Sequence, residues 1–110
     1  MVYLKPMEDC VFCKIVKGEL PSKNEYEDNE ILAFHDIDPK APVHVLIIPK
    51  KHVSKLADAE PEDVQVLGKI QIVARDLARK LGIGEAFKVK TLSGEGAGQV
   101  VFHMHYHLMG

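Results

Sequence analysis

The chain has 110 residues, of which 46% are hydrophobic and 27% charged, and its formal net charge is −2. This length and composition predict a single folded domain with one core and exclude a wholly disordered chain. No run approaches the roughly 18 apolar residues of a membrane span, and the net negative charge argues against nucleic acid or an anionic membrane as a partner. The first residues lack the apolar segment of a signal peptide, so we expect a cytoplasmic protein.

The N-terminal segment is predicted to contain a loose leader followed by a short helix. Residues 1–8 show no regular pattern. Asp9 is placed to cap a helix over residues 10–17, and Gly18 is placed to end it. Cys10 and Cys13 are the two cysteines of the chain. In a cytosolic protein this C-V-F-C spacing is typical of half a metal site or of a redox pair rather than of a structural disulfide.

The next segments are predicted to be strands and turns. Residues 26–27 and 31–35 flank the turn-prone Asp28-Asn29 and predict a hairpin. Residues 36–42 contain two prolines and predict a loop. Residues 43–48 are rich in β-branched and apolar side chains, as expected of a central strand that Pro49 would end.

The clearest helix begins near Pro61, with two acidic residues in its first turn. Its helical spacing produces one apolar stripe: Val66, Leu67, Ile70, Val73, Ala74, Leu77 and Leu81. Gly82 and Gly84 are expected to end it. A strand over residues 87–91, a glycine-rich loop over 93–98 and a last strand over 99–108 follow, which predicts an α+β fold with mostly antiparallel strands.

The last strand carries three of the six histidines at every second position. Side chains two apart share a face of a strand, so one face is predicted to hold Gln99, Val101, His103, His105 and His107. The opposite face would hold Phe102, Met104, Tyr106 and Leu108, and would receive the helix stripe. The imidazoles could bind a catalytic metal, or they could act as nucleophile and proton carriers toward phosphorus. The glycine-rich loop beside Gln99 favours the second chemistry because bare backbone amides can approach phosphate oxygens.

Three stretches together resemble one known family. G-A-G-Q-V-V-F-H-M-H-Y-H-L-M-G resembles the motif of the histidine triad (HIT) superfamily. A-F-H-D-I-D-P-K-A-P-V-H-V-L-I-I-P-K-K-H and C-V-F-C-K-I-V-K-G-E-L-P are similar to segments of its Hint branch of purine nucleoside phosphoramidases. The resemblance implies one HIT domain over residues 1–110, with a mainly antiparallel sheet of about five strands, one long helix and one short helix.

The resemblance also implies a reaction at the α-phosphate of a purine nucleoside monophosphate derivative, through a nucleotidyl-histidine intermediate. His105 would be the nucleophile, His107 would hold and protonate the phosphate and leaving group, His44 would orient the cluster and Gln99 would donate to the phosphate. Asp36 would accept hydrogen bonds from the ribose, although spacing alone leaves open a role in the turn before Pro39. The base would be enclosed by Val11, Phe12, Ile15, Leu20, Phe34, His35 and Ile37.

A second site is implied by the same resemblance. Cys10, Cys13, His52 and His103 match positions that bind a structural zinc ion in bacterial relatives, and a Cys2His2 set is a closed tetrahedral shell. The cysteines could instead form a reduced, buried pair without metal. The resemblance further implies a homodimer built through the long helix and the strand after it.

Two positions depart from the family pattern. Leu92 and Val100 stand where relatives usually carry polar side chains. These two departures keep open a nucleotide-binding regulatory or scaffold protein with little turnover. The sequence stops at Gly110, whereas the resemblance leads us to expect a short C-terminal tail. The sequence is also compatible with a dinucleoside polyphosphate hydrolase, or with a metalloenzyme that holds zinc on the triad itself. His107 argues against the transferase branch, which carries Gln there.

Overall fold

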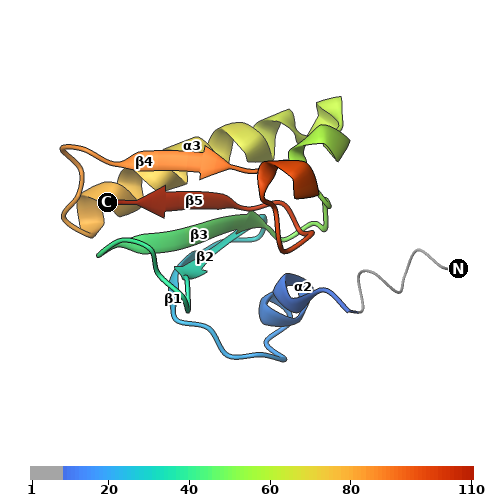
Figure 1. Ribbon diagram of the computed structural model, residues 1–110, viewed down its shortest axis with the longest axis horizontal. Coiled ribbons are helices and arrows are strands. Elements are labelled where there is room, and N and C mark those ends of the chain that lie inside the picture. Colours follow the sequence, from blue (N-terminus) through green and yellow to red (C-terminus); the bar gives the residue numbers. More distant parts are fainter. Residues whose placement is uncertain (1–8) are drawn as a thin grey trace, which may run out of the picture.

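The computed structural model describes residues 9–110, so the leader expected at residues 1–8 lies outside the described residues. Five strands form one sheet in the order β1-β2-β3-β5-β4 (Figure 1). The strands are β1 (Asn24–Glu27), β2 (Ile31–His35), β3 (His44–Pro49), β4 (Lys88–Thr91) and β5 (Tyr106–Met109). All four neighbouring pairs are antiparallel. With the short helix α2 (Val11–Val16) and the long helix α3 (Val64–Lys80), the predicted α+β fold is confirmed.

Helix α3 covers one face of the sheet. It follows a 3-10 turn, Pro61–Asp63, in which Glu60 and Asp63 form a reciprocal capping box. Its stripe packs on the side chains of alternate strand positions such as Val45 and Ile47, and the buried set from the helix is Ile70, Val73, Ala74, Leu77 and Ala78. Each of the three larger side chains, Ile70, Val73 and Leu77, contributes about 1.5 to 3 kcal/mol through removal of apolar surface from water. The predicted helix is therefore confirmed, with Ala78 as an additional core residue.

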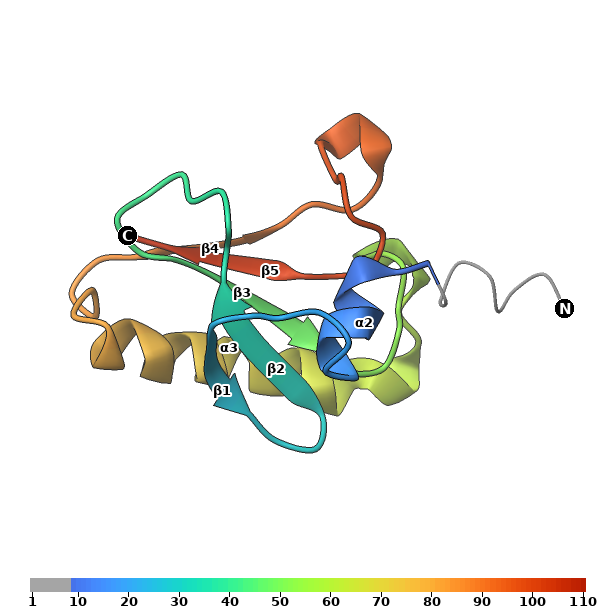
Figure 2. The same cartoon turned by 90° about the horizontal axis from the view of Figure 1, so that it is seen from below.

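The other face of the sheet is covered in part by α2. Because strand side chains alternate, Leu46 and Ile48 point away from α3 and pack with Leu32, Phe34 and the α2 residue Phe12. Figure 2 shows α3 along one side of the sheet, while the loops at residues 36–43 and 92–99 rise on the opposite side. This second face, bordered by these loops, is where the candidate site lies.

The start of α2 differs from the prediction. Cys10, not Asp9, is the N-cap, and its Sγ accepts a hydrogen bond from the backbone N–H of Cys13 at 3.3 Å. The helix therefore begins one residue later than expected. Gly18 adopts a left-handed φ of 80° just after the helix, which explains glycine at the predicted stop.

The last strand is shorter than predicted. Regular pairing begins at Tyr106, and the chain bends at residues 101–103. The upstream residues make tertiary contacts instead of a ladder: the Met104 N–H donates to the Val53 carbonyl, for example. The prediction for the apolar face was consequently correct for Tyr106 and Leu108, which pack at the α3 core, and wrong for Phe102, which is 41% exposed.

In the described part of the chain, no helix combines the length and the apolar character that crossing a bilayer requires. The longest helix, α3 (Val64–Lys80), is amphipathic, with one apolar face and one charged face.

Candidate functional site

A cavity of about 430 Å³ opens on the sheet face opposite α3. One end is apolar, with walls from α2, β2 and β3: Val11, Phe12, Ile15, Phe34 and Leu46. The other end is polar and contains Asp36, His44, Gln99, His105 and His107. An apolar slot that ends in a few convergent polar groups is the usual form of a small-molecule site.

The apolar end brings together most residues predicted to enclose a base. Phe12 and Phe34 meet edge to face, with ring centroids 5.4 Å apart. His35 and Ile37 also line the cavity; Ile37 is 99% exposed and therefore lies at the rim. Leu20 is not among the lining residues. It is 37% exposed, and the next two residues of the chain, Pro21 and Ser22, line the cavity in its place.

The three histidines of the terminal motif do not share one environment. His103 is fully buried against the cysteines, whereas His105 and His107 line the cavity with ring centroids 5.1 Å apart. The bend at residues 101–103 separates them. A single metal ion held jointly by the whole triad is therefore incompatible with this arrangement.

His105 has a defined tautomer. Its Nδ1–H donates to the backbone carbonyl of His103 at 2.8 Å, because a carbonyl can only accept. The lone pair of an unprotonated ring then lies on Nε2. Phe12 packs edge to face against this ring at a centroid distance of 5.1 Å, and the Thr91 hydroxyl donates to the His105 carbonyl at 2.7 Å. The Phe12 contact restricts the orientation of the imidazole, and the Thr91 hydrogen bond holds the backbone that carries it.

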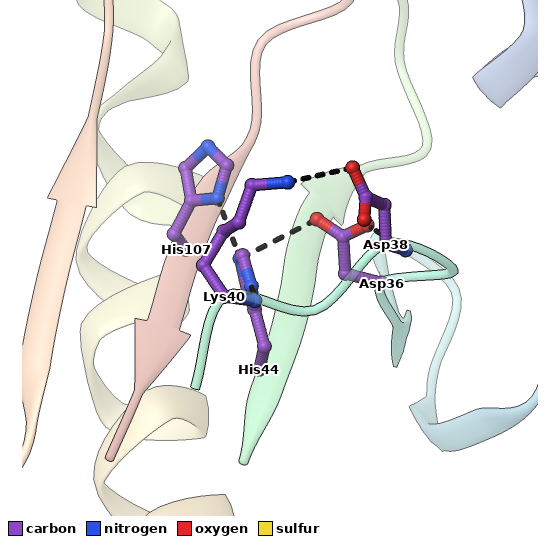
Figure 3. Close-up of polar contacts among 5 residues, drawn as sticks. All are labelled: Asp36, Asp38, Lys40, His44 and His107. Carbon is purple, nitrogen blue, oxygen red and sulfur yellow. Dashed lines mark hydrogen bonds and ion pairs between the residues drawn. The ribbon is translucent and has the colours of Figure 1, made fainter. Parts of the chain in front are cut away.

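His44 and His107 form a directed hydrogen-bond chain (Figure 3). The Lys40 backbone N–H donates to Nδ1 of His44 at 3.0 Å, so the proton of neutral His44 must be on Nε2. His44 Nε2–H lies 2.9 Å from Nδ1 of His107 and donates to it. His107 consequently carries its own proton on Nε2, the ring nitrogen that takes no part in these hydrogen bonds.

Asp36 stands beside this chain. Its carboxylate lies 3.4 Å from Nε2 of His44 and also accepts the N–H of Asp38 at 2.9 Å (Figure 3). Asp36 therefore forms the turn and lines the cavity as well, so the two interpretations left open by the sequence are compatible. Asp36, His44 and His107 also bring three ligand-type atoms within 4.8 Å of one another. The contacts of His44 with His107 and with Asp36 explain why these atoms are close, so no metal ion is needed to account for it.

The glycine-rich loop is held by Gln99. Its amide nitrogen donates to the carbonyls of Ser54 and Val101, at 2.8 and 3.0 Å, and its Oε1 accepts the Gly94 N–H at 2.8 Å. Gly94 and Gly98 have left-handed φ values of 97° and 100°, which favour glycine. Both amide hydrogens of Gln99 are thus committed to the protein backbone in this conformation.

Burial keeps the cavity histidines neutral near pH 7. It lowers the pKa of His107 to about 4, and the neighbouring His105 and His44 add to the effect. It also lowers the pKa of His44, against the opposing charge of Asp36. The pKa of His105 is lowered by burial as well, which the hydrogen bond to the His103 carbonyl partly offsets. Unprotonated imidazole is the form that can act as a nucleophile.

The second predicted cluster is also assembled. Cys10, Cys13, His52 and His103 bring four ligand atoms within 4.8 Å of one another. Sγ of Cys10 lies 3.4 Å from Nδ1 of His103, and Sγ of Cys13 lies 3.3 Å from Nδ1 of His52. His103 Nε2–H donates to the Pro49 carbonyl at 2.7 Å, which leaves its Nδ1 lone pair facing the sulfurs. These four residues could hold a metal ion.

Several lining residues were not predicted. Leu46 lies two residues after His44 on β3 and shares its face, so strand alternation contained the signal. Lys40 and Asp38 reach the cavity mouth from the 36–43 loop, where they pair at 2.6 Å, and no periodic pattern marked them. By contrast, Leu92 and Val100 were already noted in the sequence as site positions that depart from the family pattern, and both line the cavity, with Val100 85% exposed at its mouth.

Comparisons with known proteins match almost the whole chain. The family model described as "Scavenger mRNA decapping enzyme C-term binding" matches residues 9–110. "Protein HitA" of Neisseria gonorrhoeae is 45% identical over 104 residues, which cover 94% of this chain and 97% of that protein. A crystal structure of a HIT family hydrolase from Legionella pneumophila is 45% identical and superposes with a TM-score of 0.91 over 93% of this chain and 92% of that one. A HIT family hydrolase from Clostridium thermocellum is 50% identical, with a TM-score of 0.91 over 94% and 90% of the two chains.

Proposed function

Because this chain belongs to the histidine triad (HIT) superfamily, we propose that it is a nucleotide hydrolase of the phosphoramidase type found in the Hint branch. Its substrates would be purine nucleoside monophosphate derivatives that are cleaved at the α-phosphate. The main support for the proposal is that two neighbouring histidines at the polar end of an apolar slot have complementary tautomers. His105 offers a lone pair on Nε2, and His107 offers a proton on Nε2.

The proposed reaction has two steps at phosphorus. Nε2 of His105 attacks the α-phosphate and forms an N–P bond, while the bond from phosphorus to the leaving nitrogen breaks. Protonated His107 gives its proton to that nitrogen. The negative charge of bound phosphate favours the imidazolium form of His107, opposite to the effect of burial in the free protein. Because an imidazolium carries a proton on both ring nitrogens, His44 must give up its donation to Nδ1 of His107 when this form is present. Water then cleaves the N–P bond, the nucleoside monophosphate leaves, and a proton returns to His107.

The remaining site residues position the substrate in this proposal. The Asp36 carboxylate would accept hydrogen bonds from the ribose hydroxyls. The slot around Phe12, Ile15 and Phe34 would hold a purine face, and Val11, His35 and Ile37 would border it. Gln99 would need to exchange one of its two backbone acceptors for the phosphate in order to donate to it. Without that exchange its role is to hold the glycine-rich loop.

A structural zinc ion in the Cys10, Cys13, His52 and His103 cluster is the second part of the proposal. Zn–S bonds of about 2.3 Å and Zn–N bonds of about 2.0 Å in a tetrahedron require sulfur and nitrogen ligands about 3.5 Å apart. Three sulfur to nitrogen distances in the cluster, 3.3, 3.4 and 3.6 Å, fit this requirement. Four protein ligands close the shell, so the ion would link α2 to the core and take no part in the reaction.

Homodimer formation and a cytoplasmic location stay predictions. Strand β4 is an edge strand of the sheet, and its outer backbone groups could pair with a second copy.

A binding protein with little turnover is the second candidate function. Leu92 and Val100 place apolar side chains on the cavity wall, where the family pattern predicts polar ones.

Turnover of adenosine 5'-phosphoramidate by the purified protein tests the proposal. Wild type should release AMP, and mass spectrometry after rapid quenching should detect one nucleotidyl adduct. His105→Ala should lose both. His107→Ala should slow turnover by about 10² to 10⁴ yet still accumulate the adduct, because the nucleophile remains. AMP binding without turnover by the wild type would support the binding protein, and an adduct on His105→Ala would contradict the assigned nucleophile.

A further inference from the structure

Strand β4 presents a lysine next to the histidine pair. In the antiparallel register, Lys90 is directly opposite His107 of β5, which is in turn opposite Leu46 of β3. Directly opposite residues share a face, with Cβ atoms about 5 Å apart. The intervening residue Val89 packs at the α3 core. Lys90 therefore projects from the same sheet face as the histidines.

The charge of Lys90 is not neutralised within the described chain. Residues 9–110 provide carboxylate partners within 4 Å for six other lysines, but none for Lys90, which is exposed. Lys40, the lysine that lines the cavity, is already paired with Asp38 at 2.6 Å. Burial is the main reason that the pKa values of His107 and His44 are lowered, and the positive charge of Lys90 adds to the lowering of both.

The order of the strands indicates how a bound nucleotide would be oriented across the sheet. The apolar slot lies over α2, β2 and β3, the histidine His107 lies on β5, and β4 is the next strand outward. A nucleotide with its base in the slot and its α-phosphate at His105 and His107 has its nucleoside on the β2 and β3 side. The group beyond the α-phosphate then extends past His107 toward β4, the strand of Lys90, which lies outside the set of residues that line the cavity.

We propose that Lys90 is a specificity-determining residue that favours substrates with an anionic leaving group, such as a phosphate or nucleoside diphosphate bonded to the α-phosphate. The inference rests on the proposed function, since it assigns the leaving-group side of the same reaction. The bond between the α-phosphorus and the bridging oxygen breaks, its electron pair stays on that oxygen, and the N–P bond to His105 forms. Lys90 attracts the negative charge of the departing phosphate, which needs no proton to leave.

The flexible four-carbon stem of lysine suits this role. A lysine ammonium is a compact charge with three donors that can follow a mobile phosphate. A neutral leaving group such as ammonia gains nothing from it. Pairing of a second copy along the β4 edge would use backbone groups and would leave Lys90 on the histidine face.

The test compares two substrates that share the adenosine 5'-phosphoryl half. Adenosine 5'-phosphoramidate has a neutral leaving group, and diadenosine triphosphate releases ADP. Lys90→Met should lower kcat/KM for diadenosine triphosphate about tenfold, the usual scale for losing a charge-assisted contact. It should leave the phosphoramidate value within about twofold, since no charge departs there. Lys90→Arg should retain activity on both. Added salt should weaken the diadenosine triphosphate reaction of the wild type more than that of Lys90→Met.

Lys88→Met is the matched control. Lys88 is two residues away on the same strand face but is opposite Met109 rather than His107. Equal losses on both substrates, an equal effect of Lys88→Met, or no effect of Lys90→Met would overturn the inference while the proposed function stands. A changed oligomeric mass of Lys90→Met on size-exclusion chromatography, with equal losses on both substrates, would reassign Lys90 to an interface. No turnover of either substrate by the wild type would remove both proposals.

Discussion

The hydrogen-bond chain from Lys40 through His44 to His107 makes the protonated nitrogen of His107 measurable. His44→Leu removes the donor that engages Nδ1 of His107 at 2.9 Å. Leucine has nearly the same bulk, and position 44 is buried with 4% exposure, so the core should remain filled. The change therefore addresses the tautomer of His107 rather than the packing of β3.

The magnitude follows from one neutral hydrogen bond. Such a bond contributes about 1 kcal/mol, which corresponds to about a fivefold bias toward the Nε2–H tautomer of His107. Without that bias a larger share of His107 would carry its proton on Nδ1, away from the cavity. We expect kcat for adenosine 5'-phosphoramidate to fall about fivefold to tenfold, far less than the 10² to 10⁴ expected for removing a proton-transferring histidine altogether.

Two assays check this prediction together. Nitrogen-15 NMR of the histidine rings should show Nε2–H for His44 and His107 and Nδ1–H for His105 in the wild type. In His44→Leu the His107 signals should shift toward a mixture of tautomers. A thermal melt verifies that the variant is folded. A wild-type His107 protonated on Nδ1, or an unchanged His107 tautomer together with a lost rate in the folded variant, would refute the reasoning.

Three further predictions concern stability and specificity. Burial lowers the pKa of His107 to about 4 and lowers that of His44, so the unfolded chain binds more protons below the ordinary histidine value of about 6.5. The urea midpoint should therefore fall as pH drops from about 6.5 toward 4, and less steeply in His107→Phe; an unchanged midpoint would contradict this. Purified protein should contain one zinc ion by elemental analysis, and Cys13→Ser should lose the ion and melt at least about 10 °C lower, since metal binding contributes to folding; a metal-free wild type with the same melting temperature would contradict it. Leu92→Asn combined with Val100→Ser should raise phosphoramidate turnover, and no gain would show that these apolar residues do not limit the reaction.

Local sequence patterns were sufficient to predict most of the fold. The apolar stripe of α3 and the β-branched run of β3 are strong periodic signals, and both elements lie where they were predicted. The last strand was predicted too long because apolar and histidine residues alternate from Gln99 onward. The bend at residues 101–103 depends on contacts from distant segments, including Pro49, Val53 and Ser54, which no local pattern encodes.

The candidate site was predictable as a set of residues but not as an arrangement. Alternation implied that His103, His105 and His107 share one face, whereas the structure turns His103 toward the cysteines. The tautomers depend on backbone partners, such as the Lys40 N–H and the His103 carbonyl, which only the three-dimensional structure identifies. Leu20 was assigned to the slot by resemblance, and the path of the chain after α2 brings its neighbours there instead.

His103 lies beside the cysteines, whereas His105 and His107 line the cavity. This difference predicts which positions should change together as related sequences diverge. His103 contributes its ring to the cysteine cluster, while its carbonyl orients His105. A backbone carbonyl is present whatever side chain the residue carries. In a lineage that loses Cys10 and Cys13, selection on the ring of His103 should relax, whereas selection on His105 and His107 should not. Substitutions at position 103 are therefore expected to co-vary with the cysteines rather than with the other two histidines.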